Sequence, residues 1–179
     1  MPFLLAMSRA IDALNTRIGA VCDYLVLLAV LISAGNAASR YAFSISSNAF
    51  LEIQWQLFAA IVMLGASVTL KKNEHVRVDI LYSWVSPATR LWIDLVGIIL
   101  FMLPVLALLF WLSVPFFAES FRLDEHSANP GGLPFWPVKF MLPLGFALLF
   151  LQALSELVKR IAAVRGVMTL DTAYEKPLQ

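Results

Sequence analysis

The sequence predicts an all-α integral membrane protein with four transmembrane helices and both termini in the cytoplasm. Hydrophobic residues make up 60% of the 179 residues and charged residues 14%, whereas a soluble domain is about half apolar and a quarter charged. The apolar residues gather in four runs, each at least roughly the 20 residues that cross a bilayer as a helix. A third observation, the unequal distribution of lysine and arginine, predicts the orientation.

The four apolar runs define the expected spans in chain order. They are Ile18 to Phe43, Ala49 to Leu70, Leu91 to Phe117 and Leu133 to Leu157. Leading into the first run, Met7, Ile11, Leu14 and Ile18 recur at helical spacing, which predicts that residues 1–17 form an amphipathic helix lying in the membrane interface. The expected organisation is an N-terminal interfacial segment (1–17), a four-helix transmembrane domain (18–158) and a cytoplasmic tail (159–179).

Lysine and arginine concentrate on one side of these spans. Cytoplasmic flanks of membrane proteins carry an excess of both residues. The richer side has Arg9, Arg17, Lys71, Lys72, Arg77, Arg90, Lys159, Arg160, Arg165 and Lys176, and the poorer side has Arg40, Arg122 and Lys139. The richer side is therefore predicted to be cytoplasmic, and it includes both ends of the chain.

The connection between spans two and three, "KKNEHVRVDILY", places His75 and Asp79 four residues apart, on one face if it is helical. Val76, Ile80 and Trp84 share another face, which predicts a helix lying on the inner leaflet. A metal site or an acid–base pair is one interpretation of His75 and Asp79, and solvated or locally paired side chains are the other. A metal site needs three or four convergent ligands, and the only other histidine is predicted across the membrane, which favours the second interpretation.

The remaining composition argues against catalysis, cofactors and nucleic acid. Net charge is +1 and there is a single cysteine, Cys22, so neither a basic nucleic-acid surface nor a paired-cysteine motif is indicated. The predicted spans contain no histidine for haem ligation, and the sequence has no GxSxG motif or glycine-rich phosphate loop. We expect no catalytic residue, cofactor or metal in this chain.

Polar residues near the outer ends of the spans are the candidate sites. Arg40 ends span one and Glu52 opens span two across a short connection, which predicts an ion pair; the alternative is that each reaches the headgroups separately. Trp55 follows within span two, and Lys139 lies just inside span four. These side chains are structural or interface candidates.

The longest outer connection, residues 118–134, is acidic. It contains Glu119, Asp124 and Glu125. The "NPGG" stretch, with Asn129, Gly131 and Gly132, is a strong turn signal. The loop is either a docking surface for another protein or an ordinary hairpin connection.

Three stretches resemble a known family. They are "LEIQWQLF", "NEHVRVDILY" and "NPGGLPFWPVKFMLPLGFALLFLQALSEL". Together they are similar to the small membrane subunit of TRAP transporters, the DctQ family, over about Ile11 to Arg165. The nearest branch resembles the one labelled for mannitol and chloroaromatic compounds, with relatives in 2-oxo acid and lactate systems. Many members of this family carry two adjacent glutamates in span two. This chain has only one carboxylate there, Glu52.

The resemblance implies a scaffold in a bacterial inner membrane. In this family the small subunit binds a large subunit of the DctM family, which holds the sodium and substrate sites and moves as an elevator. A periplasmic binding protein delivers the substrate, a small organic acid in the branches named above. Sodium is therefore expected at the large partner. The alternative kept open is an autonomous small homodimeric transporter.

Overall fold

The computed structural model describes residues 1–45, 47–73 and 84–168, and these are almost entirely helical. The elements are α1 (Pro2–Phe43), α2 (Asn48–Lys72), α4 (Pro87–Gly97), the π-helix η1 (Ile98–Met102), α5 (Leu103–Arg122) and α6 (Trp136–Val164). Because α4, η1 and α5 follow one another without a break, they form one long helix. Four helices are therefore long and apolar enough to cross a membrane, as the sequence predicts.

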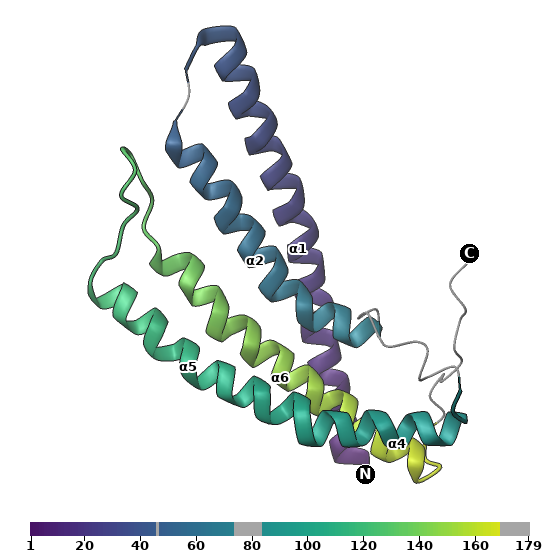
Figure 1. Cartoon of the computed structure of the whole chain (residues 1–179). Helices are drawn as coiled ribbons and strands as arrows, with labels where there is room; N and C mark the ends of the chain where they lie inside the picture. Colours follow the sequence, from purple (N-terminus) through teal and green to yellow (C-terminus); the bar gives the residue numbers. More distant parts are fainter. Residues whose placement is uncertain (46, 74–83, 169–179) are drawn as a thin grey trace.

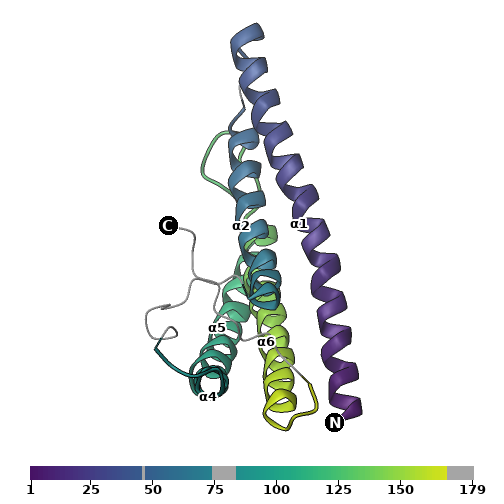
Figure 2. The ribbon, with the colours of Figure 1, turned by 90° about the vertical axis from the view of Figure 1, so that its right-hand side faces the viewer.

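The helices form two antiparallel hairpins that spread apart in a V (Figure 1). One hairpin is α1 with α2, and the other is α5 with α6; α6 also packs against both α1 and α2. The N-terminus, α4 and the C-terminal end of α6 lie at the base of the V, and the tips of the two hairpins lie at its open side (Figure 1). Seen from the side, α1 runs along the edge of the molecule beside α2 (Figure 2).

Local sequence signals explain where the helices begin and end. The Ser47 hydroxyl accepts a hydrogen bond from Ala49 N (3.3 Å), and the Ser86 hydroxyl accepts one from Thr89 N (3.3 Å). These contacts satisfy amide groups that have no partner within the first turn of a helix. At the opposite ends, Ser44 and Asn73 take left-handed backbone conformations after α1 and α2, a common way to terminate a helix.

The π-helix η1 has a cause in the sequence. Pro104 has no amide hydrogen, and its ring would collide with the carbonyl of Leu100 in a regular α-helix. The hydrogen-bond ladder shifts just before it, so that Leu103 N donates to Ile98 O, the longer spacing of a π-helix. Span three thereby remains continuous past an internal proline.

The hairpins approach each other closely at Gly145. A Cβ atom at this position of α6 would lie 2.8 Å from both Cβ and the main-chain oxygen of Met63 in α2, and small residues allow such close helix approach in membranes. Two small apolar clusters flank this contact, one around Leu64 and Leu148 and the other around Leu70 and Leu106. Most other large apolar side chains point outward, as expected of helices that face lipid.

Two helices extend past the predicted ends of their spans. Residues 2–17 are not a separate element, because α1 runs unbroken from Pro2 into the first span; an interfacial position of this segment stays a prediction. The fourth apolar run was predicted to end at about Leu157, and α6 continues as a helix to Val164 and so includes Lys159 and Arg160; the end of the span itself stays a prediction. The predicted inner-leaflet helix, with His75 and Asp79, lies outside the described residues.

Candidate functional site

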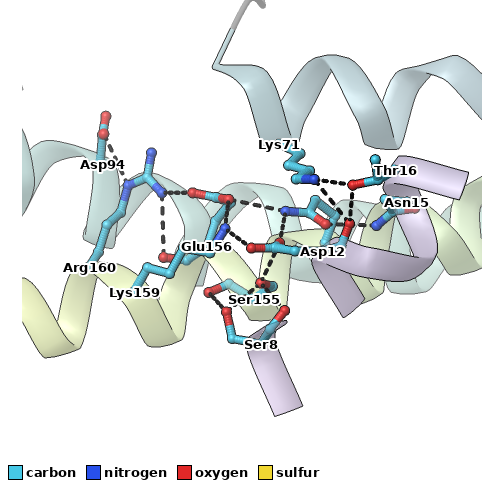
Figure 3. Close-up of polar contacts among 11 residues, drawn as sticks. Ser8, Asp12, Asn15, Thr16, Lys71, Asp94, Ser155, Glu156, Lys159 and Arg160 are labelled. Carbon is cyan, nitrogen blue, oxygen red and sulfur yellow. Dashed lines mark hydrogen bonds and ion pairs between the residues drawn. The ribbon is translucent and has the colours of Figure 1, made fainter. Parts of the chain in front are cut away.

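Polar side chains form a continuous network at the base of the V, here called the N-terminal cluster (Figure 3). It joins α1, α2, α4 and α6. Its carboxylates and its basic side chains are equal in number, with three of each. The members are Ser8, Asp12, Asn15, Thr16, Ser67, Lys71, Asp94, Gln152, Ser155, Glu156, Lys159 and Arg160.

Lys159 connects α6 with the first helix. Its Nζ lies 2.7 Å from Asp12 Oδ2 of α1 and 2.7 Å from Glu156 Oε1, one turn earlier on α6. The second oxygen of Asp12 accepts hydrogen bonds from Gln152 Nε2 (2.9 Å) and Ser155 Oγ (3.1 Å). Every carboxylate oxygen in this group therefore has a donor, as low-dielectric surroundings require of a charged group.

Arg160 extends the network to the third span. Its Nη1 lies 2.7 Å from Glu156 Oε2, and its Nε lies 3.1 Å from Asp94 Oδ2 on α4. The side chains of Arg160 and Asp94 are only 9% and 15% exposed, so this contact between α6 and α4 contributes more to the choice of helix partners than a surface pair does.

Neutral side chains complete the cluster. Gln152 and Asn15 are fully buried, and Asn15 Nδ2 donates to Gln152 Oε1 at 2.7 Å. Ser67 of α2 donates to Asn15 Oδ1 at 2.8 Å, while the hydroxyls of Ser8 and Ser155 lie 2.7 Å apart. These contacts link α1, α2 and α6 through matched donors and acceptors, which stabilise helix association in membranes.

A second group, here called the loop cluster, ties the outer connection to α2. Its centre is Glu52, which is 4% exposed. Glu52 Oε1 accepts hydrogen bonds from the Ser127 hydroxyl and from Asn129 Nδ2 (2.8 Å), and Oε2 accepts one from Leu133 N at 2.7 Å. Nearby, Gln56 Nε2 donates to Pro134 O at 3.2 Å.

The predicted Arg40–Glu52 pair was wrong. Among the described residues, the ion pairs do not include one between these two side chains, and both Glu52 oxygens are occupied by the loop cluster. The physical reason is proximity: the loop brings three donors to one carboxylate, including a main-chain amide that needs an acceptor. Sequence analysis had considered only the short connection between spans one and two.

Glu125 and Lys139 form the second part of the loop cluster. The Lys139 ammonium pairs with Glu125 and also lies 4.3 Å from the centre of the Phe116 ring, a favourable cation–π position. The hydrogen bond from Lys139 lowers the pKa of the Glu125 carboxyl below its ordinary value. Glu119 is likewise paired, with Arg122 at 2.7 Å, so much of the acidic charge expected of this loop is neutralised within the chain.

The turn residues of the loop behave as predicted. Gly131 has a positive φ of 71°, a conformation that glycine adopts without steric cost. A Cβ atom on Gly132 would lie 2.5 Å from Ser127 Cβ and 2.9 Å from the oxygen of Asn129. Both glycines therefore allow the tight turn that presents Ser127 and Asn129 to Glu52.

Trp55 lies beside the loop cluster rather than inside it. Its ring centroid is 5.9 Å from that of Phe135, and both rings line an apolar groove of about 340 Å³ between α2 and α6. The Glu125–Lys139 pair lies at the same groove. Of the predicted site residues in the described ranges, all but Arg40 therefore belong to, or adjoin, the loop cluster.

Sequence analysis missed the N-terminal cluster. We assigned the helical face at Met7, Ile11, Leu14 and Ile18 to the apolar side of residues 1–17, yet Ser8, Ile11 and Asn15 are the buried members of this segment. A signal was available in α6, where polar residues recur at helical spacing through an apolar stretch. They are Gln152, Ser155, Glu156 and Lys159.

Four long apolar helices joined by internal polar contacts define a multi-pass integral membrane protein. A family model described as "Tripartite ATP-independent periplasmic transporters, DctQ component" matches residues 29–163, which is most of the chain. The chain therefore belongs to the DctQ family and is a small membrane component of a TRAP transporter, not a member of an enzyme family. Comparisons with curated proteins and with solved structures found no match.

Family membership implies partners. A DctQ component associates with a large membrane subunit of the DctM family and with a substrate-binding protein. Within the part of the chain that the structure describes, no group of three His, Cys, Asp or Glu side chains is placed to hold a metal ion.

Proposed function

We propose that this chain is the scaffold that braces the large, elevator-type subunit of a TRAP transporter in the bacterial inner membrane. The observation that carries the proposal is the position of its polar contacts. The N-terminal cluster and the loop cluster hold the spans together at opposite ends, while large apolar side chains on the outward faces remain exposed. Such a body is internally cross-linked and presents its apolar surface to lipid and to a membrane partner.

The proposed orientation has both termini in the cytoplasm. It rests on the excess of lysine and arginine at the base of the V. Reporter fusions after Arg165 and within residues 118–133 test it, with a cytoplasmic signal expected from the first and a periplasmic signal from the second. A periplasmic signal after Arg165 would refute this orientation.

The transported substrate is proposed to be a small organic acid taken up with sodium, both bound by the large subunit. This finer proposal rests on the resemblance to the mannitol and chloroaromatic branch and its 2-oxo acid and lactate relatives. In this arrangement His75 and Asp79 act in assembly rather than in ion binding. Titration of candidate acids against the purified binding protein identifies the substrate class.

Reconstituted uptake tests the bracing function. Liposomes with the large subunit, the binding protein and this chain should accumulate substrate along a sodium gradient, and omission of this chain should abolish uptake. Full uptake without the chain would contradict the brace. Uptake by this chain alone would instead support the autonomous transporter, so the same experiment separates the two functions.

A further inference from the structure

A groove of about 430 Å³ opens between α1 and α2 beside the N-terminal cluster. Its walls include three of the smallest side chains, Gly19, Ala20 and Gly65. A Cβ atom on Gly65 would meet nothing within 4 Å, so this wall is open rather than filled by a neighbouring helix. Small residues of this kind let the backbone of another helix come close.

The two ends of the groove carry opposite charges. Asp23 lines one end, is exposed, and makes no hydrogen bond or ion pair with any described residue. Lys71 and Lys72 line the other end. Within the described ranges Lys72 is exposed and unpaired, and Lys71 donates only to neutral oxygens, the main-chain oxygen of Asp12 and the hydroxyl of Thr16.

The position of Asp23 makes an uncovered surface unfavourable. It lies five residues inside the predicted span that starts at Ile18, about 8 Å along the helix. A carboxylate on a lipid-facing position at that depth is costly and is expected to have a partner. The N-terminal cluster does not supply one, because Lys159 and Arg160 pair with its own carboxylates and Lys71 lies at the opposite end of the groove.

A phospholipid does not fit both ends of the groove. Its phosphate would suit Lys71 and Lys72, as basic sites between helices do. Its acyl chain would then lie along the glycine wall and against the Asp23 carboxylate, where it offers no donor. A protein helix satisfies both ends, because its side chains can place a cation and an anion about two turns apart.

We propose that this groove binds a transmembrane helix of the large subunit. That helix presents a basic side chain to Asp23 and an acidic side chain or its C-terminal carbonyl groups to Lys71 and Lys72. The inference rests on the proposed function and adds the face of the chain that docks the partner. Charge complementarity selects this helix over lipid and fixes its direction in the groove.

Co-purification of the large subunit with variants of the full chain tests the docking face. Asp23→Lys is expected to reduce the recovered large subunit by more than about tenfold, since it places like charges together at a desolvated contact. Gly65→Leu, which fills the groove without an internal clash at Cβ, should give a similar loss. Tyr24→Lys introduces the same charge at the neighbouring, 74% exposed position and should retain the complex.

Folding and lipid binding are measured on the same variants. The thermal unfolding of the isolated small subunit should be unchanged in Asp23→Lys, because the native carboxylate has no described partner in the chain. Recovery of the large subunit at the wild-type level with Asp23→Lys would overturn the inference while leaving the brace intact. Loss of bound anionic phospholipid, with an intact complex, in Lys71→Gln/Lys72→Gln would also overturn it in favour of a lipid site.

Cross-linking identifies directly which face of this chain contacts the large subunit. In a Cys22→Ala background, Ala20→Cys should cross-link to the large subunit within the assembled transporter. Cross-linking from Tyr24→Cys, with none from Ala20→Cys, would show that the large subunit docks on another face of this chain. Failure of the wild-type chain to bind the large subunit at all would overturn the proposed function together with this inference.

Discussion

The N-terminal cluster and the loop cluster perform similar structural tasks with different chemistry. At the base of the V, side chains from four elements meet, and three carboxylates are matched by three basic groups. At the tip, one buried carboxylate, Glu52, accepts neutral donors and a main-chain amide from a single loop. The first arrangement fixes which helices pack together, and the second fixes where a loop lies.

The difference shows how a membrane protein specifies its fold. Between apolar helices in lipid there is little hydrophobic preference for one partner over another, so small residues and polar contacts decide the pairing. When one member of a network of interlocked charges is removed, an opposite charge is left unpaired in a low-dielectric site. When a carboxylate held by neutral donors is removed, only neutral groups lose a partner, so the two clusters should respond differently to substitution.

The largest effect is expected from Lys159→Met. This change leaves Asp12 without a basic partner, because its remaining contacts are with the neutral side chains of Gln152 and Ser155. Removing one partner of a buried pair costs roughly 3 kcal/mol in free energy of unfolding, measurable by denaturant titration in mixed micelles. The control is Glu119→Ala, which breaks the exposed pair with Arg122 and should leave stability unchanged; equal losses from both would show that the N-terminal cluster is not the stronger contact.

The apolar contact between the two clusters provides the second comparison. Gly145→Ala forces a methyl group against Met63 and should cost about 2 kcal/mol through overpacking. Gly97→Ala meets open space in a helix and should be neutral or stabilising, because alanine favours helix formation by up to about 1 kcal/mol. Unfolding in the same micelles measures both, and tolerance of alanine at Gly145 would mean that α2 and α6 separate readily.

Glu52→Gln tests the loop cluster alone. The amide retains one acceptor oxygen but loses the charge and the second acceptor, so either the amide of Leu133 or the side chains of Ser127 and Asn129 lose their acceptor. We expect faster hydrogen exchange at residues 127–133 with only a small change in global unfolding. Asn48→Ala, which removes a single 3.3 Å contact to the Pro130 oxygen, is the matched control. Unchanged exchange in Glu52→Gln would contradict the role of the carboxylate.

The smallest expected effect is a change in how stability depends on pH when Glu125 is replaced. Because the folded-state pKa of Glu125 lies below its unfolded value, its contribution to stability is complete above the ordinary glutamate pKa and is lost as pH falls through the folded-state pKa. Melting temperatures of the wild type and Glu125→Gln should therefore differ near neutral pH and converge between about pH 5 and pH 3. A difference that persists at the acid end would show that the Lys139 pair is not its source.

The sequence by itself determined the number, approximate position and helical nature of the spans. The reason is local, because a segment in lipid must satisfy its own backbone hydrogen bonds and expose apolar side chains over the membrane thickness. It also indicated the turn at Gly131 and Gly132 and singled out Glu52, since a charged residue near a span end stands out in an apolar run. The family followed from the same motifs.

The tertiary structure decided which polar side chains meet. Glu52 pairs with a loop some 80 residues later rather than with Arg40, and Asp12 meets Lys159, which follows it by 147 residues. Helical spacing predicts that Ser8 and Asn15 share a face, but only packing against α6 shows that this polar face is buried. Partner choice depends on the distance between helices that are remote in sequence, and that distance is set by packing contacts such as Gly145 against Met63.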